Sequence, residues 1–141
     1  MNKIMAGVFA FVAVFALTVE YARADVYITV DKSSQEMYVQ TPTDSFVWDV
    51  STGRKGYNTP VGKYKPTRLA KMHYSKKYDN APMPNSIFFH EGYAIHATNA
   101  VNRLGAPASH GCVRLSPQNA KWLYQIVLEN GMQNTHIEIV E

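Results

Sequence analysis

Cysteine is almost absent from this 141-residue sequence, which contains only Cys112. No disulfide can form within the chain, so a fold held together by bridged cysteines is excluded. A lone thiol is either buried as a small apolar group, paired with another molecule, or kept free as a nucleophile. Its neighbours favour the last use: His110 lies two positions before it, Gly111 directly before it and Arg114 two positions after it. Nearby cations stabilise the reactive thiolate.

Long hydrophobic runs are also scarce, and the one that exists covers residues 4–19. Lys3 precedes it, and Ala22-Arg23-Ala24 follows with the small-x-small pattern of a signal-peptide cleavage site. The run is shorter than the ~20 residues that usually cross a bilayer. We therefore expect residues 1–24 to be a cleaved signal peptide and the mature protein, from Asp25, to act in the periplasm or cell envelope. An uncleaved membrane anchor is the alternative.

Net charge is small, because 14 basic and 11 acidic side chains give +3 for the whole chain. This excess is too small to predict a nucleic-acid partner or strong binding to a membrane surface. Internal repeats and low-complexity tracts are absent, so residues 25–141 predict one domain that is long enough to bury a core. The histidines outside the Cys112 region, His73, His90 and His136, lack metal-ligand spacing, and we expect neither a metal nor a cofactor.

Alternating apolar and polar residues, rich in β-branched and aromatic types, predict short strands along much of this domain. The predicted strands cover residues 26–30, 35–39, 45–51, 63–67, 86–89, 93–96 and 135–140. One helix is predicted between Ser116, a good N-cap followed by Pro117, and Gly131, which ends it. The predicted fold class is mostly β, with one main α-helix near the C-terminus.

Residues 68–85 follow neither the helical nor the strand period and contain Pro82 and Pro84. We expect an irregular segment here. Long loops in compact domains often serve as lids or binding loops. We therefore favour a lid or binding loop here over a surface loop without function.

A cysteine nucleophile needs a base or cation beside it, donors for the oxyanion, and a carbonyl delivered to the sulfur. His110 and His96 are the two candidate bases, and His96 ends a predicted strand, which is a rigid place from which to present an imidazole. The backbone N–H groups of Gly111 and Cys112 are candidate oxyanion donors. Arg114 stays protonated, so it can bind a substrate carboxylate or favour the thiolate, but it cannot act as a base.

The run Ser109-His110-Gly111-Cys112-Val113-Arg114-Leu115, preceded by Ile95-His96-Ala97-Thr98, resembles the catalytic domain of the L,D-transpeptidases, the YkuD-like family of bacterial cell-wall enzymes. Residues 50–54 and 59–64 resemble the loop that this family carries after its early strands. The resemblance covers essentially the whole mature chain and implies the family's mostly β, sandwich- or barrel-like fold. One departure is Ala97, where the family often has glycine.

The resemblance also implies roles for the matching residues. Cys112 would attack the carbonyl of the third residue of a peptidoglycan tetrapeptide stem and release the fourth residue, D-alanine, while His96 accepts and donates the proton. Oxyanion and substrate binding would fall to Ser109, His110, Gly111 and Arg114. An amine would then resolve the acyl-enzyme; it would come from another stem peptide, giving a 3→3 cross-link, from a D-amino acid, or from an outer-membrane protein. We expect a monomer with no nucleic-acid partner.

Two alternatives stay open at this stage. Water instead of an amine would make the same site an L,D-carboxypeptidase, and the sequence does not separate the two. A degenerate, non-enzymatic wall-binding module is the other alternative, and the intact set of His96, His110, Cys112 and Arg114 argues against it. The resemblance further implies acylation by carbapenems.

Overall fold

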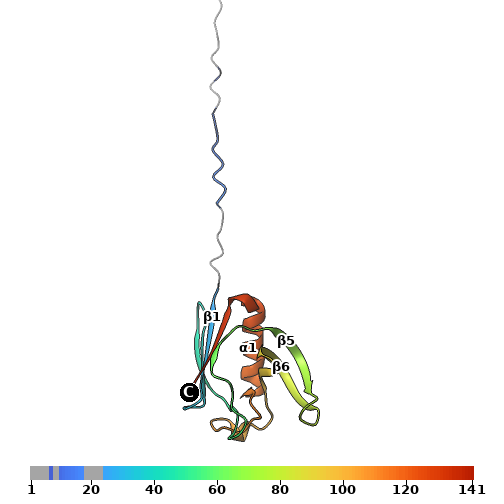
Figure 1. The fold of residues 1–141 in the computed structure, drawn as a ribbon. Coiled ribbons are helices and arrows are strands. Elements are labelled where there is room, and N and C mark those ends of the chain that lie inside the picture. Colours follow the sequence, from blue (N-terminus) through green and yellow to red (C-terminus); the bar gives the residue numbers. More distant parts are fainter. Residues whose placement is uncertain (1–6, 8–9, 18–23) are drawn as a thin grey trace, which may run out of the picture.

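The computed structural model describes residue 7, residues 10–17 and residues 24–141. Two sheets and one long helix make up the domain (Figure 1). The strands are β1 (Val26–Asp31), β2 (Glu36–Gln40), β3 (Ser45–Asp49), β4 (Gly62–Tyr64), β5 (Arg68–Ser75), β6 (Ala81–His90), β7 (Tyr93–Ala97), β8 (Val113–Leu115) and β9 (Thr135–Val140). The helix is α1 (Pro117–Asn130), and two 3₁₀ turns are η1 (Val101–Arg103) and η2 (Met132–Asn134).

The first sheet has the strand order β3-β2-β1-β9-β4 and the second has the order β5-β6-β7-β8. In Figure 1 the first sheet lies on one side, the β5–β6 hairpin on the other, and α1 between them. Buried residues alternate along each central strand, for example Val26, Ile28 and Val30 on β1, because successive side chains point to opposite faces. These residues and the apolar stripe of α1, including Leu123 and Val127, form one continuous core shared by both sheets.

The mostly β fold class and the single main helix are confirmed. Ser116 caps α1, because its side-chain oxygen accepts a hydrogen bond from the Asn119 N–H at 3.2 Å. Gly131 ends the helix with a φ of 93°, which favours glycine. The strand predicted over residues 63–67 is shorter than expected and ends at Tyr64; Pro66, which lacks an N–H for a ladder, follows two residues later.

The prediction of an irregular segment over residues 68–85 is wrong. These residues belong to a long hairpin, in which β5 and β6 pair from Arg68 opposite Phe88 to Ser75 opposite Ala81. Pro82 and Pro84 are tolerated because residues 81–86 of β6 pair only with β5, while the pairing with β7 begins at Ile87. On the side of the strand without a neighbour, a missing N–H breaks no ladder bond.

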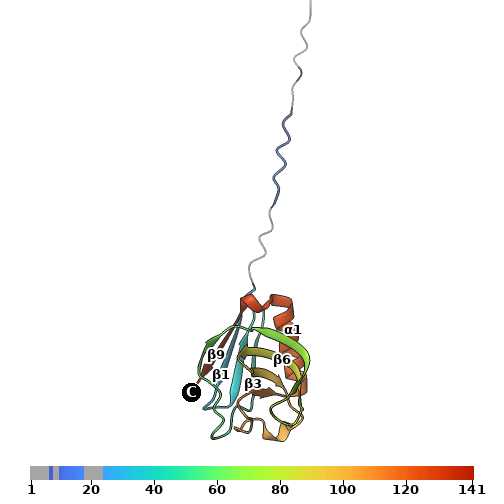
Figure 2. The same ribbon diagram turned by 45° about the vertical axis from the view of Figure 1, so that its right-hand side comes forward.

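The loops that carry the motif residues meet at one end of the domain. Figures 1 and 2 show the 50–61 loop and the loop between β7 and β8 at the end of the domain opposite to the start of β1. Hydrogen bonds join the two loops directly, from Arg54 N–H to Ser109 C=O and from Ser109 N–H to Thr52 C=O, each at 3.0 Å. The fold therefore brings two distant stretches of sequence together around Cys112.

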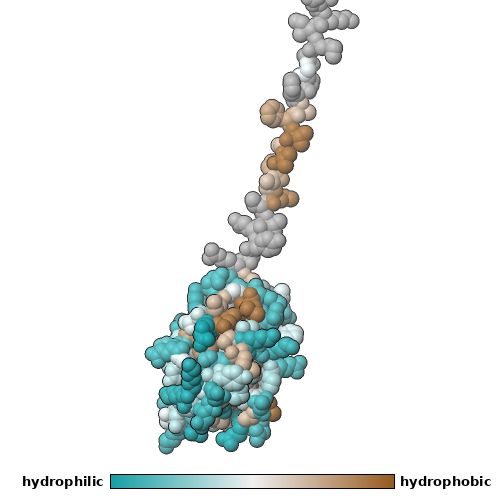
Figure 3. All heavy atoms as spheres, turned by 90° about the vertical axis from the view of Figure 1, so that its right-hand side faces the viewer, coloured by the Kyte–Doolittle hydropathy of each residue, from teal (hydrophilic) through white to brown (hydrophobic). Residues whose placement is uncertain are grey.

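The predicted signal peptide falls partly outside the described residues, which omit 1–6, 8–9 and 18–23. Residues 10–17 are described, and their apolar side chains are exposed, with Phe11 at 98% and Leu17 at 91%. Figure 3 shows this stretch in brown, in contrast to a domain face that is mostly teal. Within the described ranges, no helix has the length and hydrophobicity needed to span a bilayer.

Candidate functional site

Two parallel strands position the predicted catalytic pair. On β7 and β8, His96 lies opposite Arg114 in the ladder, between the pairs Ile95–Val113 and Ala97–Leu115. Those flanking pairs face the core, so the alternation of a strand turns the His96 and Arg114 side chains to the opposite face. Cys112 directly precedes β8 and packs on that same opposite face, against the cluster that contains Ala94. The backbone positions of Cys112 and His96 are thus offset by two residues along the ladder, about 7 Å.

A cleft of about 560 Å³ opens over this face. It brings together most of the residues predicted from the sequence; His96, Ser109, His110, Cys112 and Arg114 all line it. Gly111 does not line the cleft and instead shapes the turn beneath it. The opposite wall comes from the β5–β6 hairpin, so the segment that we expected as a lid does border the site, as a strand pair rather than an irregular loop.

The His96 ring is held in one tautomer. Its side chain is buried, with 7% exposed, and Nδ1 lies 2.8 Å from the Ala97 carbonyl oxygen. Since a carbonyl only accepts, Nδ1 carries the proton and Nε2 has a free lone pair when the ring is neutral. Burial lowers the pKa of His96 to about 4, with a smaller contribution from Arg114. At neutral pH the ring is therefore an uncharged base.

The Cys112 sulfur is also uncharged at neutral pH. Burial raises the pKa of the Cys112 thiol, against smaller opposing effects from the Ala94 N–H and the Arg114 charge. The sulfur lies 4.0 Å from the Gly92 carbonyl oxygen, a weak contact that suits a protonated S–H donor. Desolvation outweighs the opposing effect of Arg114 on the Cys112 pKa, so the site favours a neutral thiol beside a neutral imidazole.

Ser109 and Gly111 fix the turn before the sulfur. The buried Ser109 hydroxyl accepts a hydrogen bond from the Gly111 N–H at 3.0 Å and donates one to the Cys112 carbonyl at 2.5 Å. Gly111 has a φ of 123°, and a Cβ there would lie 2.6 Å from a ring carbon of Tyr93. Glycine is thus required at this position. The Gly111 N–H is already engaged in the turn, which leaves the Cys112 N–H as the other predicted oxyanion donor.

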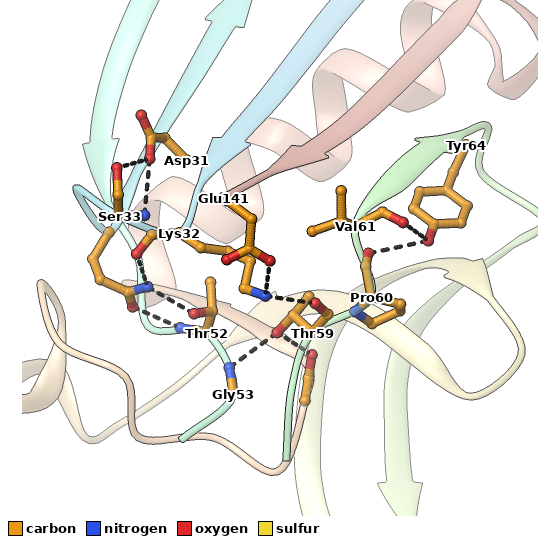
Figure 4. A network of polar contacts seen from close by, with 12 residues as sticks. Asp31, Lys32, Ser33, Thr52, Gly53, Thr59, Pro60, Val61, Tyr64 and Glu141 are labelled. Atoms are coloured by element: carbon orange, nitrogen blue, oxygen red, sulfur yellow. Dashed lines mark hydrogen bonds and ion pairs between the residues drawn. The ribbon is translucent and has the colours of Figure 1, made fainter. Parts of the chain in front are cut away.

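A second buried hydroxyl, on Thr59, holds the same turn from the other side (Figure 4). Thr59 Oγ1 accepts from the Gly53 N–H at 2.9 Å and donates to the Gly111 carbonyl at 2.7 Å. Gly53 is enclosed as well, because a Cβ there would lie 1.7 Å from the Tyr57 carbonyl oxygen. Residues 50–54 and 59–64 were expected to resemble a family loop, and no local pattern in them indicates that Thr59 bonds to Gly111.

The loop itself is anchored to the first sheet. Buried Gln35, at the turn before β2, donates from Nε2 to Thr52 Oγ1 at 2.7 Å and accepts from the Thr52 N–H at 2.9 Å. Lys32 donates to the Thr59 carbonyl at 3.1 Å and forms an ion pair with Glu141 at 3.0 Å (Figure 4). The position of Cys112 therefore depends on a chain of bonds that reaches the β1–β2 turn and the C-terminal residue.

His110 lies between two aromatic rings at the rim of the cleft. Its ring stacks on Tyr78, from the tip of the β5–β6 hairpin, with centroids 4.2 Å apart, and meets Tyr57 edge-on at 4.9 Å. Desolvation, followed by the charges of Arg54 and Arg114, lowers the pKa of His110. Contacts with Tyr57 and Tyr78 hold the ring in place, and nothing in the sequence indicates that these two tyrosines contact His110.

Arg114 is fixed through its backbone, which exchanges hydrogen bonds with Ser51 at 2.9 and 3.1 Å. Its half-buried side chain lines the cleft beside Cys112. Burial lowers the pKa of Arg114, but a guanidinium stays protonated at any relevant pH. In the described part of the chain, no group of three or more His, Cys, Asp or Glu side chains is arranged to hold a metal ion.

The raised pKa of Cys112 predicts slow alkylation at neutral pH, because the thiolate is the reactive form. The rate of reaction with iodoacetamide should rise with pH through a midpoint above that of an ordinary cysteine. The same chain in denaturant, with the same single thiol, is the matched control and should titrate at the ordinary value. A pH-independent, fast reaction of the folded protein below about pH 7 would show a preformed thiolate instead.

Replacement of Thr59 by valine should loosen the turn at Gly111 while nearly preserving side-chain volume. Two buried backbone groups lose their partner, which costs about 1–3 kcal/mol in the free energy of unfolding. The alkylation midpoint of Cys112 should move towards the ordinary value as the sulfur becomes more exposed, and Thr59→Ser should restore it. Thr135→Val removes an equally buried hydroxyl that donates to the Gly131 carbonyl at 2.9 Å, away from the site. An equal shift of the midpoint in this control would contradict the role of Thr59.

Comparisons with known proteins find the same domain elsewhere. The family model for the L,D-transpeptidase catalytic domain (YkuD) matches residues 25–139. The probable L,D-transpeptidase YbiS of Escherichia coli K12 is 31% identical over 104 residues, which cover 57% of this chain and 34% of YbiS. The probable L,D-transpeptidase ErfK/SrfK of the same strain is 24% identical over 139 residues, which cover 81% of this chain and 44% of that protein.

Solved structures share the fold. The L,D-transpeptidase of Stackebrandtia nassauensis superimposes with a TM-score of 0.72 at 27% identity, covering 85% of this chain and 57% of that one. L,D-transpeptidase 3 from Mycobacterium tuberculosis, in complex with a faropenem-derived adduct, gives a TM-score of 0.73 at 22% identity, covering 84% and 61%. This chain therefore spans only part of the length of its relatives. The match over residues 25–139, supported by the shared fold, shows that the chain belongs to the L,D-transpeptidase catalytic domain (YkuD) family.

Proposed function

We propose that this protein is a cysteine-dependent L,D-transpeptidase of peptidoglycan. One observation carries the proposal: in a domain of this family, the only cysteine of the chain lies in the same cleft as a buried histidine whose Nε2 is free to accept a proton. Acyl transfer through a thioester requires at least a nucleophile and a base, and here adjacent strands hold both.

In the first half-reaction, the Cys112 sulfur attacks the carbonyl carbon of the third stem residue, and the thiol proton passes to His96 Nε2. The tetrahedral intermediate collapses with cleavage of the peptide C–N bond. The leaving amine of D-alanine takes the proton back from His96, so the ring is neutral again and the carbonyl is held as a thioester. The low pKa of His96 suits the second transfer, because its imidazolium form readily gives up a proton.

In the second half-reaction, an amine attacks the thioester carbonyl and passes a proton to His96. The C–S bond breaks, and the sulfur recovers the proton as the new amide is released. A second stem peptide as acceptor gives a 3→3 cross-link, and a D-amino acid or an outer-membrane protein would be attached by the same chemistry. In this mechanism both partners start neutral, and charges form only during each proton transfer and disappear at its end.

Stabilisation of the oxyanion is assigned chiefly to the Cys112 N–H, since the Gly111 N–H already donates to Ser109. Ser109 and Thr59 hold the carbonyls of this turn, which fixes the direction of the remaining N–H. Arg114 and His110 line the same cleft and are placed to bind the polar stem. A volume of about 560 Å³ lies within the usual range of ligand pockets and accommodates a few residues of peptide.

The proposed setting is the periplasm or cell envelope, reached through cleavage of residues 1–24 as a signal peptide. The apolar run, the small residues at 22 and 24, and the start of the family match at residue 25 support this proposal. A single thiol in an exported protein has no intrachain partner with which to form a disulfide, so it stays available for catalysis.

Replacement of Cys112 by alanine should abolish turnover of tetrapeptide stems while the fold persists, because the change in side-chain volume is small. Incubation of the mature domain with defined muropeptides, followed by mass analysis of the products, measures the loss. Intact-protein mass spectrometry with a carbapenem should show a covalent adduct on the wild type and none on the variant. Full activity of the variant would overturn the assignment of the nucleophile.

Replacement of His96 by alanine should lower kcat by roughly 10²–10⁴-fold, the usual contribution of a general base. His110→Ala is the matched comparison, because it removes an imidazole from the rim of the same cleft. We expect it to cost much less, since His110 contacts the tyrosine rings rather than a strand carbonyl. If His110→Ala is far more damaging than His96→Ala, the roles of the two histidines are exchanged.

A further inference from the structure

The charges of this chain are strongly segregated, although the net charge is small. Residues 50–78 contain no aspartate or glutamate, whereas eight of the 14 basic side chains of the chain lie there. These eight are Arg54, Lys55, Lys63, Lys65, Arg68, Lys71, Lys76 and Lys77, and all are exposed. All 11 acidic residues lie outside this segment, so a uniform surface with a charge of +3 is a poor description of the molecule.

Part of this segment borders the cleft that contains Cys112. Arg68, Lys76 and Lys77, from β5 and the hairpin tip, line the cleft itself. Arg54 lies close enough from the other side for its charge to lower the pKa of both His110 and Arg114. We name these four side chains, Arg54, Arg68, Lys76 and Lys77, the cationic rim; Arg114 adds a fifth positive charge at the floor of the cleft.

The rim is held in place without being neutralised. Three of its cations lie over aromatic faces: Arg68 over Phe88 at 3.9 Å, Arg54 over Tyr57 at 4.9 Å, and Lys77 over Tyr78 at 5.5 Å. A ring attracts a cation but does not cancel its charge. Among the residues that the structure describes, no rim cation forms an ion pair with a carboxylate, and Glu91, the only acidic residue that lines the cleft, lies 3.8 Å from His90.

We propose that the cationic rim is a docking surface for a peptide that carries two or more free carboxylates and that it delivers this peptide to Cys112. The inference rests on the proposed function, in which such a peptide is the acyl donor, and it adds that carboxylates away from the reacting carbonyl determine binding. Exposed cations around a cleft raise the local concentration of an anionic ligand, and salt weakens this effect. An anionic membrane surface is the competing partner. A flat bilayer reaches cations that line a cleft less readily than a peptide does, so the peptide is favoured.

The test compares two donors, a tetrapeptide stem with free side-chain carboxylates and the same stem with those groups converted to carboxamides. Lys76→Gln/Lys77→Gln should raise KM for the carboxylate donor about 3- to 10-fold, as expected for two exposed charge contacts, while kcat changes little. KM for the carboxamide donor should change less than about twofold. An increase of NaCl from about 0.05 to 0.5 M should bring the wild type close to the variant, because the Debye length shrinks.

Lys63→Gln/Lys65→Gln is the matched control, since it removes the same charge from exposed positions on and beside β4, outside the cleft. An equal increase of KM in this control would mean that net charge, not the rim, is responsible. An unchanged KM in Lys76→Gln/Lys77→Gln, with normal product formation, overturns docking but leaves the proposed function intact; the absence of product with both donors overturns the proposed function itself. Wild-type binding to vesicles of phosphatidylglycerol and phosphatidylcholine that the rim variant loses, with unchanged KM, would assign the rim to a membrane.

Discussion

The site depends on one short peptide being held on both sides by buried hydroxyls. Thr59 donates to the carbonyl of Gly111, and Ser109 donates to the carbonyl of Cys112, so successive peptide planes before and after the sulfur are fixed. Each hydroxyl also accepts a backbone N–H, from Gly53 and Gly111 respectively, so both donor and acceptor capacity are used. A buried hydroxyl that loses one of its two partners costs free energy of folding, so each hydroxyl favours the arrangement in which both bonds form together. Removal of one bond releases the turn as a unit.

In the proposed mechanism, this constraint allows a desolvated thiol to serve as a nucleophile. Burial keeps both the sulfur and the imidazole neutral, which would be a disadvantage if the enzyme needed a standing thiolate. A fixed turn and a fixed tautomer remove the need for one, because the proton can pass along a prepared path at the moment of attack. A neutral resting pair also leaves less thiolate open to oxidation, a benefit to a free cysteine under the proposed export.

Much of the fold follows from local sequence, and the limits of that prediction have physical causes. The strands around Ile28 and Ile137 and the capped helix after Ser116 depend on period, propensity and capping, which neighbouring residues determine. The β5–β6 hairpin does not, because Pro82 and Pro84 argue against a strand unless the unpaired side of that strand is known. Similarly, Cys112 and His96 could be identified from their motifs, but the bond from Thr59 to Gly111 spans 52 residues and leaves no periodic trace.

The distribution of charge is a second property that composition alone does not predict. Composition gives a nearly balanced chain, and on that basis neither a nucleic-acid partner nor strong binding to a membrane surface is expected. Order along the chain changes the conclusion, because an acid-free segment includes both the loop that anchors Cys112 and the strand that borders its cleft. Aromatic rings then hold three of the cations without neutralising them. The field at the cleft is therefore determined by where the fold places the charges of one segment, and the net charge conceals it, because only one carboxylate, Glu91, lines the cleft beside these cations.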